Sequence, residues 1–291
     1  MSKTLHRIFI LILILIGTAT FFYFGIYGYS YYLTSNEERF FHELHKFLKP
    51  SGLIGHGLGI IGSLMMIIGV SSYMIRKRVR KFFRLGFLKY WLEVHIFLCS
   101  VGPILVLYHT TFKFGGIVAV SFWSMIAVVV SGVIGRFIYI QIPRSIQGQE
   151  YSLDELKSLD QDYTNRLKAE FGLDDILITK LEYFNKIQIH KRTNFFSIGG
   201  LIIKDHYMNK KLIKEFKREL ISRKIESSKV KAIIKLCNSK LILSRKISLL
   251  HSVHKIFKYW HIIHLPFAII MLIIMLVHVT VAVTFGYKWV F

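Results

Sequence analysis

The stretch YWHIIHLPFAIIMLIIMLVHVTVAVTF, from Tyr259 to Phe285, contains an almost unbroken apolar run that begins at Ile262. A bilayer core about 30 Å thick is crossed by about 20 such residues in a helix, so the run is long enough to span a membrane. His264 and His278 lie inside it, fourteen positions apart. Ionisable side chains at that depth are costly and usually mark a function. The stretch therefore predicts a transmembrane helix that carries two functional histidines.

A second stretch, from Trp91 to Thr111, repeats this arrangement with His95 and His109, which are also fourteen positions apart. At about 100° per residue, fourteen steps return to within about 40° of the start, and a rise of about 1.5 Å per residue separates the two histidines by about 21 Å. Each helix therefore presents two imidazoles on one face, near opposite sides of the membrane. Two such helices can hold two iron porphyrins, each iron bound by one imidazole from each helix.

The composition is that of a membrane protein, since 53% of the 291 residues are hydrophobic. The formal net charge of +22 does not indicate nucleic-acid binding, because basic residues gather in the cytoplasmic loops of membrane proteins and contact anionic lipid there. No recognised nucleic-acid motif is present. Two isolated cysteines, Cys99 and Cys237, cannot build a four-cysteine iron–sulfur site, and no CxxCH motif occurs. Any haem would therefore be bound non-covalently, as haem b.

Five apolar segments predict an all-α polytopic fold with five transmembrane helices. We interpret the first segment as an uncleaved anchor, because it is longer than the apolar core of a signal peptide and lacks an evident cleavage site. The predicted spans are Ile8 to about Leu33, Leu53 to Ile75, about Tyr90 to Phe112, Ile117 to about Ile140, and Tyr259 to Phe285.

These spans divide the chain into four parts. Residues 1–34 form the anchor, and residues 35–143 contain the second to fourth spans. Residues 144–258 are polar and lysine-rich, and residues 259–291 contain the fifth span. We expect the second to fifth spans to form a four-helix bundle around two haems.

A basic loop between the second and third spans sets the predicted orientation, because such loops stay in the cytoplasm. The N-terminus is then cytoplasmic, and the third and fifth spans run outward in the same direction. Parallel direction places His95 level with His264 on the cytoplasmic side, and His109 level with His278 on the outer side. We therefore predict an inner haem between His95 and His264 and an outer haem between His109 and His278.

Three further polar residues have open roles. His56, near the outer end of the second span, could be a third axial ligand, a base at a quinol site or a satisfied interfacial histidine. His261 competes with His264, but it lies about 100° from the face of His278, against about 40° for His264. Arg136 could extend to the lipid headgroups or pair with the propionates of the inner haem.

Glycines also mark the predicted haem bundle. The second span has Gly55, Gly59, Gly62 and Gly69 at helical spacing on one side. They allow close helix packing, and they also leave a face without side chains against which a flat macrocycle could lie. Gly102, seven positions past His95, lies between the two predicted ligands of its span, where a larger side chain would clash with a porphyrin. We include Gly59 and Gly102 in the predicted haem-binding set.

The polar region 144–258 predicts a small helical cytoplasmic domain. Ser152 and Glu155 form a capping box, and Gly172 can end the helix that follows. The region contains no P-loop, no GxGxxG motif and no cysteine cluster. We interpret its scattered histidines as surface residues: His190, His206, His251 and His254.

The two His-x13-His spans, His95/His109 and His264/His278, resemble those of respiratory di-haem b cytochromes. They are also similar to those of the membrane domain of ferric reductases and NADPH oxidases. The resemblance extends over the spans between about residues 52 and 286 and leaves out the polar region between the fourth and fifth spans. It implies that the four histidines are axial haem ligands.

Two shorter segments, GRFIYIQIPRS at Gly135 to Ser145 and WHIIHLPF in the fifth span, are similar to segments of bacterial membrane cytochromes. This resemblance implies a bacterial cytoplasmic membrane. The chain departs from the oxidases in having no flavin- or NADPH-binding domain after the fifth span. It departs from the cytochrome bc complex in having no evident quinol-site motif.

The resulting prediction is an oxidoreductase subunit, a di-haem b cytochrome that carries electrons across the membrane between a quinone pool and a partner redox protein. The expected partner is a periplasmic c-type cytochrome or a cytoplasmic iron–sulfur protein. One alternative is the membrane subunit of a metal or oxygen reductase that works with a separate flavoprotein. A second alternative is a haem-free membrane scaffold that presents the polar domain to a cytoplasmic partner.

Overall fold

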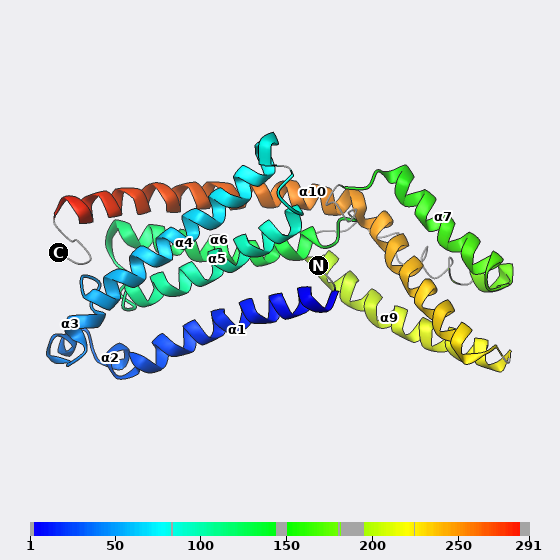
Figure 1. The fold of residues 1–291 in the computed structure, drawn as a ribbon, viewed down its shortest axis with the longest axis horizontal. Coiled ribbons are helices and arrows are strands. Elements are labelled where there is room, and N and C mark those ends of the chain that lie inside the picture. The colour runs from blue at the N-terminus through cyan, green and yellow to red at the C-terminus, as the bar shows by residue number, and fades with distance from the viewer. Residues whose placement is uncertain are drawn as a thin grey trace. The chain divides into compact units, whose positions relative to one another are not determined.

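The computed structural model describes residues 3–82, 84–143, 150–179, 181, 195–223 and 225–285 (Figure 1). Within these ranges the extended regular elements are all helices. Five of these helices are long and apolar enough to cross a membrane. The prediction of an all-α, multi-pass membrane protein is confirmed.

The chain forms two compact units. The first consists of Met1–Ile134 and His261–Phe291, and the second of Gly135–Trp260. The second unit therefore begins at the end of the fourth span, nine residues before the expected boundary at residue 144. The reason is local packing, because Ile138 and Ile142 lie in one apolar cluster with Val253.

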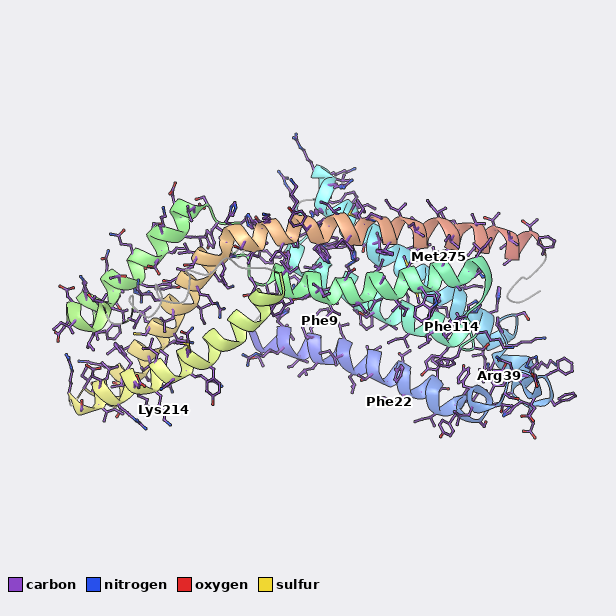
Figure 2. The ribbon with its side chains drawn as sticks, turned by 180° about the vertical axis from the view of Figure 1, so that it is seen from behind. Phe9, Phe22, Arg39, Phe114, Lys214 and Met275 are labelled. Carbon is purple, nitrogen blue, oxygen red and sulfur yellow. The ribbon has the colours of Figure 1, made fainter. Side chains whose placement is uncertain are left out.

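The first predicted span is divided into two helices. Helix α1 (Lys3–Tyr27) ends before Gly28, and a short helix α2 (Tyr29–Leu33) follows. The ring of Tyr32 lies where a Cβ at position 28 would stand, so the break occurs at a glycine. The prediction of one continuous span from Ile8 to about Leu33 is therefore wrong. Most apolar side chains of α1 are exposed, including Phe22 (Figure 2), as a lipid-facing helix requires.

Two antiparallel helices, α4 (Leu53–Arg78) and α5 (Leu88–His109), form the centre of the first unit. Their backbones are in close contact at Gly62 and Gly102. A Cβ at either glycine would stand 2.7 Å from the carbonyl oxygen of the other, closer than real Cβ atoms approach. The small residues of α4 thus allow tight packing, which is how helices associate where lipid removes the hydrophobic driving force.

A turn after α5 leads into α6 (Gly116–Tyr139), which packs beside the last helix, α10 (Ser227–Thr284). The Ser121 hydroxyl donates a hydrogen bond of 3.1 Å to the carbonyl oxygen of Met271, across these two helices. Residues of α4, α6 and α10 share one apolar core: Met66, Phe122, Met125, Met271 and Met275. Val106 and Leu107 of α5 pack against it.

The predicted fifth span is the C-terminal part of α10, which is a single helix of 58 residues. The sequence analysis expected a boundary near Lys258, between an amphipathic segment and the span. The structure has no break there, and α10 begins in the second unit and ends in the first. Pro266 lies inside the helix without ending it.

A buried arginine organises the connection between α2 and α4, which contains the short helices η1 (Glu38–Phe41) and α3 (His45–Leu48). Arg39 is 6% exposed and donates hydrogen bonds to the carbonyl oxygens of Tyr32 at 2.7 Å, Thr34 at 2.9 Å and Thr111 at 2.6 Å. Its guanidinium also lies over the ring of Tyr31, 5.4 Å from the ring centroid, and Arg39 is labelled in Figure 2. The connection is thereby attached to the turn that follows α5.

The second unit is helical, as predicted. It contains α7 (Leu153–Ala169), α9 (Phe195–Ser222) and the N-terminal part of α10. The capping box is confirmed, and the hydrogen bonds that Ser152 makes to Glu155 hold the pKa of that carboxyl below its ordinary value. Gly172, with φ of +62°, follows the end of α7, also as predicted. The core joins residues of all three helices, including Leu167, Phe216, Leu220, Ile233 and Leu241.

Of the four histidines expected on the surface of the polar region, His251 and His254 are exposed, which confirms that interpretation for them. His190 and the side chain of His206 lie outside the described residues.

We predict that Gly102→Ala destabilises the first unit, because the added methyl group would overlap the backbone of Gly62 and the side chain of Met66. Overpacking of this kind costs about 1–3 kcal/mol. The measurement is the thermal unfolding of the detergent-solubilised full chain. Gly132→Ala in α6 is the matched control, because a Cβ at Gly132 would meet no atom within 4 Å. Equal stability of the two variants would contradict the proposed close contact.

Candidate functional site

Three imidazoles from three helices meet near one end of the first unit. The ring centroids of His109 in α5 and His278 in α10 are 6.4 Å apart, with an interplanar angle of 61°. His56 in α4 lies on another side of His109, with ring centroids 6.5 Å apart. The predicted pair His109 and His278 is thus brought together, and His56 is a third imidazole at the same level.

The ring of His109 is held by the backbone of α4. Its Nδ1 lies 2.8 Å from the carbonyl oxygen of Gly55. A carbonyl oxygen only accepts, so Nδ1 carries the proton and the lone pair of the neutral ring is on Nε2. Gly59 leaves the space that the ring occupies, because a Cβ there would stand 2.8 Å from Nδ1.

We call the two heights of the predicted histidine pairs the outer level (His109 and His278) and the inner level (His95 and His264). At the inner level, a backbone carbonyl of α4 holds His95, as one holds His109. The Nδ1 atom of His95 lies 3.0 Å from the carbonyl oxygen of Gly69, so it too carries the proton. The Cys99 sulfur is 3.6 Å from the same nitrogen, and the ring of Tyr73 lies against the imidazole with centroids 5.4 Å apart. The orientation of His95 is therefore set by contacts on several sides.

His264 is held by a side chain of α6. Its Nδ1 is 2.6 Å from the hydroxyl oxygen of Ser131, and that hydroxyl donates a hydrogen bond of 2.9 Å to the carbonyl oxygen of Val128. The serine has one proton, so in the arrangement in which it goes to Val128, the serine oxygen accepts from Nδ1–H of His264.

A simple register connects these contacts. Gly55 and Gly69 are fourteen positions apart, and so are His95 and His109. Because α4 and α5 run antiparallel in close contact, each glycine carbonyl meets one imidazole. The sequence analysis selected the glycines for their lack of side chains and missed the carbonyl acceptors. The equal spacing of the two glycines and the two histidines is the signal that could have found them.

The contact at the outer level also bears on the relative direction of two helices. His109, the last residue of α5, lies beside His278 near the C-terminal end of α10, and the two helices run in the same direction (Figure 1). The apolar core around Met66 and Met271 occupies the bundle between the levels. The structure thus brings together His109 and His278, the pair predicted for the outer level, and the pairing of His95 with His264 stays a prediction.

The remaining predicted residues are placed differently from one another. His264 is partly buried, whereas His261 is exposed on α10. Gly102 lies against Gly62 and Met66 of α4, so its role in this structure is helix packing. In the second unit the guanidinium of Arg136 lies over the ring of Tyr139, with its carbon 5.7 Å from the centroid.

The donor set of the two levels suits iron in a porphyrin, which takes two axial ligands from the protein. A metal–imidazole nitrogen bond is about 2 Å long, so two imidazoles that share a metal from opposite sides have centroids about 6 Å apart. The 6.4 Å between His109 and His278 matches that value, and so does the 6.5 Å between His109 and His56, so the centroid distance alone does not select the pair. Hydrogen bonds from Nδ1 to a neighbouring acceptor are the usual way to orient such ligands. Across the described ranges, no group of three or more His, Cys, Asp or Glu side chains could hold a metal ion.

Comparisons with known proteins return no match to a family model, to a curated protein or to a solved structure.

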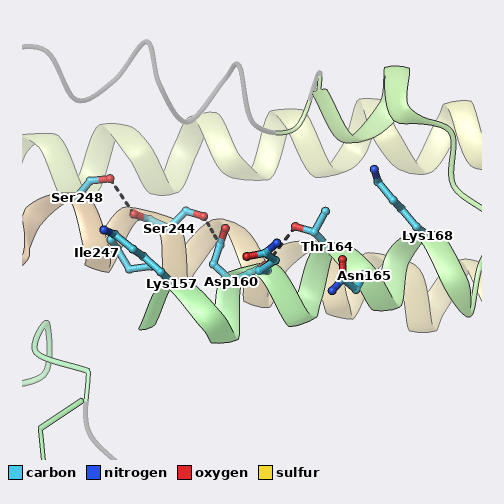
Figure 3. Close-up of a pocket in the computed structure, with 9 residues that line it drawn as sticks. Lys157, Asp160, Thr164, Asn165, Lys168, Ser244, Ile247 and Ser248 are labelled. Atoms are coloured by element: carbon cyan, nitrogen blue, oxygen red, sulfur yellow. Dashed lines mark hydrogen bonds between the residues drawn. The ribbon is translucent and has the colours of Figure 1, made fainter. Parts of the chain in front are cut away.

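A polar cavity of about 480 Å³ lies in the second unit, between α7 and α10 (Figure 3). The side chain of Lys240 is buried beside it, with Nζ 2.8 Å from Oδ2 of Asp160 and 2.7 Å from the hydroxyl oxygen of Thr164. The Ser244 hydroxyl donates to Oδ1 of Asp160 at 2.6 Å. These bonds join α7 to α10 and give the network a structural role.

We predict that Lys240→Met destabilises the second unit, because it leaves the Asp160 carboxylate without its buried cation. Removing one partner of a buried pair costs about 3 kcal/mol or more, and the Asp160 side chain, at 27% exposed, places the effect at the low end of that range. The measurement is the rate of limited proteolysis within residues 150–260 of the full chain. Lys231→Met, at an exposed position of the same helix, is the control and should leave the rate unchanged.

Proposed function

We propose that this chain is a di-haem b-type cytochrome subunit that carries electrons across a membrane. The observation that carries the proposal is the pair of matched histidine levels on two parallel helices, α5 and α10. The geometry supports ligation of one haem by His109 and His278 and of the other by His95 and His264. For isolated histidines in a membrane helix, hydrogen bonding within the core would be sufficient explanation, but it does not account for two pairs at equal spacing.

His109 with His278, and His95 with His264, would each hold one haem b, which would supply one-electron transfer when bound. The protein's part is to present Nε2 of each histidine at a fixed height and angle. For His109 and His95 the α4 carbonyls of Gly55 and Gly69 do this, and for His264 the hydroxyl of Ser131 does so. The two levels are about 21 Å apart along each helix.

The apolar core between the two levels also affects the electrostatic environment of the two sites. Its methionine and phenylalanine side chains exclude water from the middle of the bundle, which keeps the dielectric constant low around both sites. A low dielectric disfavours extra charge and so influences the redox potential of any group bound there. In this proposal the two sites are separated by an apolar interval of about 21 Å, which is shorter than the bilayer core.

In this proposal the electrons pass between a quinone pool and a redox partner, either a periplasmic c-type cytochrome or a cytoplasmic iron–sulfur protein. The basic residues around Arg76 and Lys89 favour a cytoplasmic position for the loop between α4 and α5, and hence for the N-terminus, in a bacterial inner membrane. Anionic lipid would contact this loop.

We expect about two haem groups per chain in the purified protein, measured as the pyridine haemochrome against protein concentration. The reduced protein should show the Soret and α bands of a low-spin b cytochrome. A chain purified without haem from cells that make haem in excess would favour the scaffold alternative. Reduction by a flavoprotein but not by quinol would favour the reductase alternative.

We further expect the histidine variants to fall into two pairs. His109→Ala and His278→Ala should each lose the same haem, and His95→Ala and His264→Ala should each lose the other, because each iron needs one ligand from each helix. Optical redox titration distinguishes the haem that remains in each variant. His261→Ala is the control and should retain both. If His56→Ala loses a haem that His278→Ala retains, the ligand assignment at that level is wrong.

A further inference from the structure

Of the four predicted ligands, His95, His109 and His264 have a hydrogen-bond partner at Nδ1, and among these His264 is the one oriented by a side chain. The other two meet backbone carbonyls of α4, which are present whatever the residue type. The acceptor of His264 is the hydroxyl of Ser131 in α6, at 2.6 Å. Among the three acceptors, a single substitution can therefore remove this one without moving a backbone.

The Ser131 hydroxyl is itself fixed. It donates to the carbonyl oxygen of Val128 one turn earlier, at 2.9 Å, so its lone pairs point to the imidazole. A hydroxyl that donates one hydrogen bond becomes a better acceptor for another. This chain of two hydrogen bonds runs from Nδ1–H of His264 to Ser131 and on to the carbonyl oxygen of Val128. It selects one tautomer and one orientation of the imidazole, with the lone pair on Nε2.

We infer that Ser131 is the positioning residue of the His95/His264 level, which sets the orientation and basicity of His264 as a haem ligand. This inference rests on the proposed function and extends it to a residue outside the ligand set. A strong acceptor on Nδ1–H makes the imidazole a more basic ligand, which stabilises ferric over ferrous iron. Ser131 therefore lowers the redox potential of that haem relative to a site without the hydroxyl.

The expected size of the effect of Ser131→Ala follows from other metal sites, in which loss of such an acceptor changes metal affinity by about 10- to 100-fold. If Ser131→Ala weakens ferric binding relative to ferrous binding by about tenfold, the midpoint potential of one haem rises by about 59 mV for a one-electron couple. The potential of the other haem stays the same, because Ser131 does not contribute to its level.

The chain offers two matched variants. Ser131→Thr keeps a hydroxyl that can bond both His264 and the preceding turn, so it should retain the wild-type potential. Ser121→Ala removes a hydroxyl from the same helix, which bonds the carbonyl oxygen of Met271 in the apolar core instead of an imidazole. It should leave both potentials unchanged, and so it controls for loss of any α6–α10 hydrogen bond.

The experiment is an optical redox titration of the haem-loaded full chain, combined with electron paramagnetic resonance of the two low-spin ferric signals. The haem of the His95/His264 level is identified by its absence in His95→Ala. A shift confined to that haem in Ser131→Ala, with recovery in Ser131→Thr, supports the inference. Loss of the His95/His264 haem from Ser131→Ala, with the other haem retained, supports the inference as well. Unchanged potentials, equal shifts of both haems, or the same shift in Ser121→Ala would overturn it.

A measurement without haem separates this inference from the proposed function. In haem-free full chain, NMR of isotope-labelled histidine should show His264 as the Nδ1–H tautomer, and Ser131→Ala should lose that preference. A wild-type chain that shows the preference but binds no haem would refute the cytochrome function and leave Ser131 as a positioning residue for the imidazole alone. A chain that binds two haems but shows no effect of Ser131 would refute only the inference.

Discussion

The close contact between the backbones of α4 and α5 is the constraint on which the first unit depends. At Gly62 and Gly102 no side chain separates the two helices. Only at this distance can an imidazole on α5 reach a carbonyl oxygen on α4, since a helix carbonyl lies close to its own axis. The carbonyl oxygens of Gly55 and Gly69 accept from Nδ1 of His109 and His95, and a carbonyl oxygen has two lone pairs for such bonds. Packing and ligand orientation therefore have one cause.

Burial of four imidazoles at bilayer depth needs compensation, because polar groups without partners are costly in lipid. Nδ1 of three of them has an acceptor on a neighbouring helix. The remaining requirement is at Nε2, the nitrogen that a metal would take. In these three rings the hydrogen bond that compensates burial uses Nδ1, and Nε2 is left for the proposed metal.

Buried cations outside the histidine levels have structural roles. Arg39 joins the connection after α2 to the turn after α5 through three carbonyl oxygens, and Lys240 joins α7 to α10 through Asp160. Most other basic residues of the second unit are exposed, including those along α9. The large net charge is therefore mostly surface charge, with a few cations used to hold connections and helices in place.

The sequence alone determined the number of spans, the helical second unit and the two equal histidine spacings, because apolar length and the helix period are local properties. It could not determine the break at Gly28, the continuity of α10 past Lys258, or the role of Gly102, because each depends on what a neighbouring segment does. Tertiary structure alone decided which groups orient the imidazoles. Backbone carbonyls and the hydroxyl of Ser131 are acceptors everywhere in a chain, and only the contact between helices selects the ones that meet a histidine.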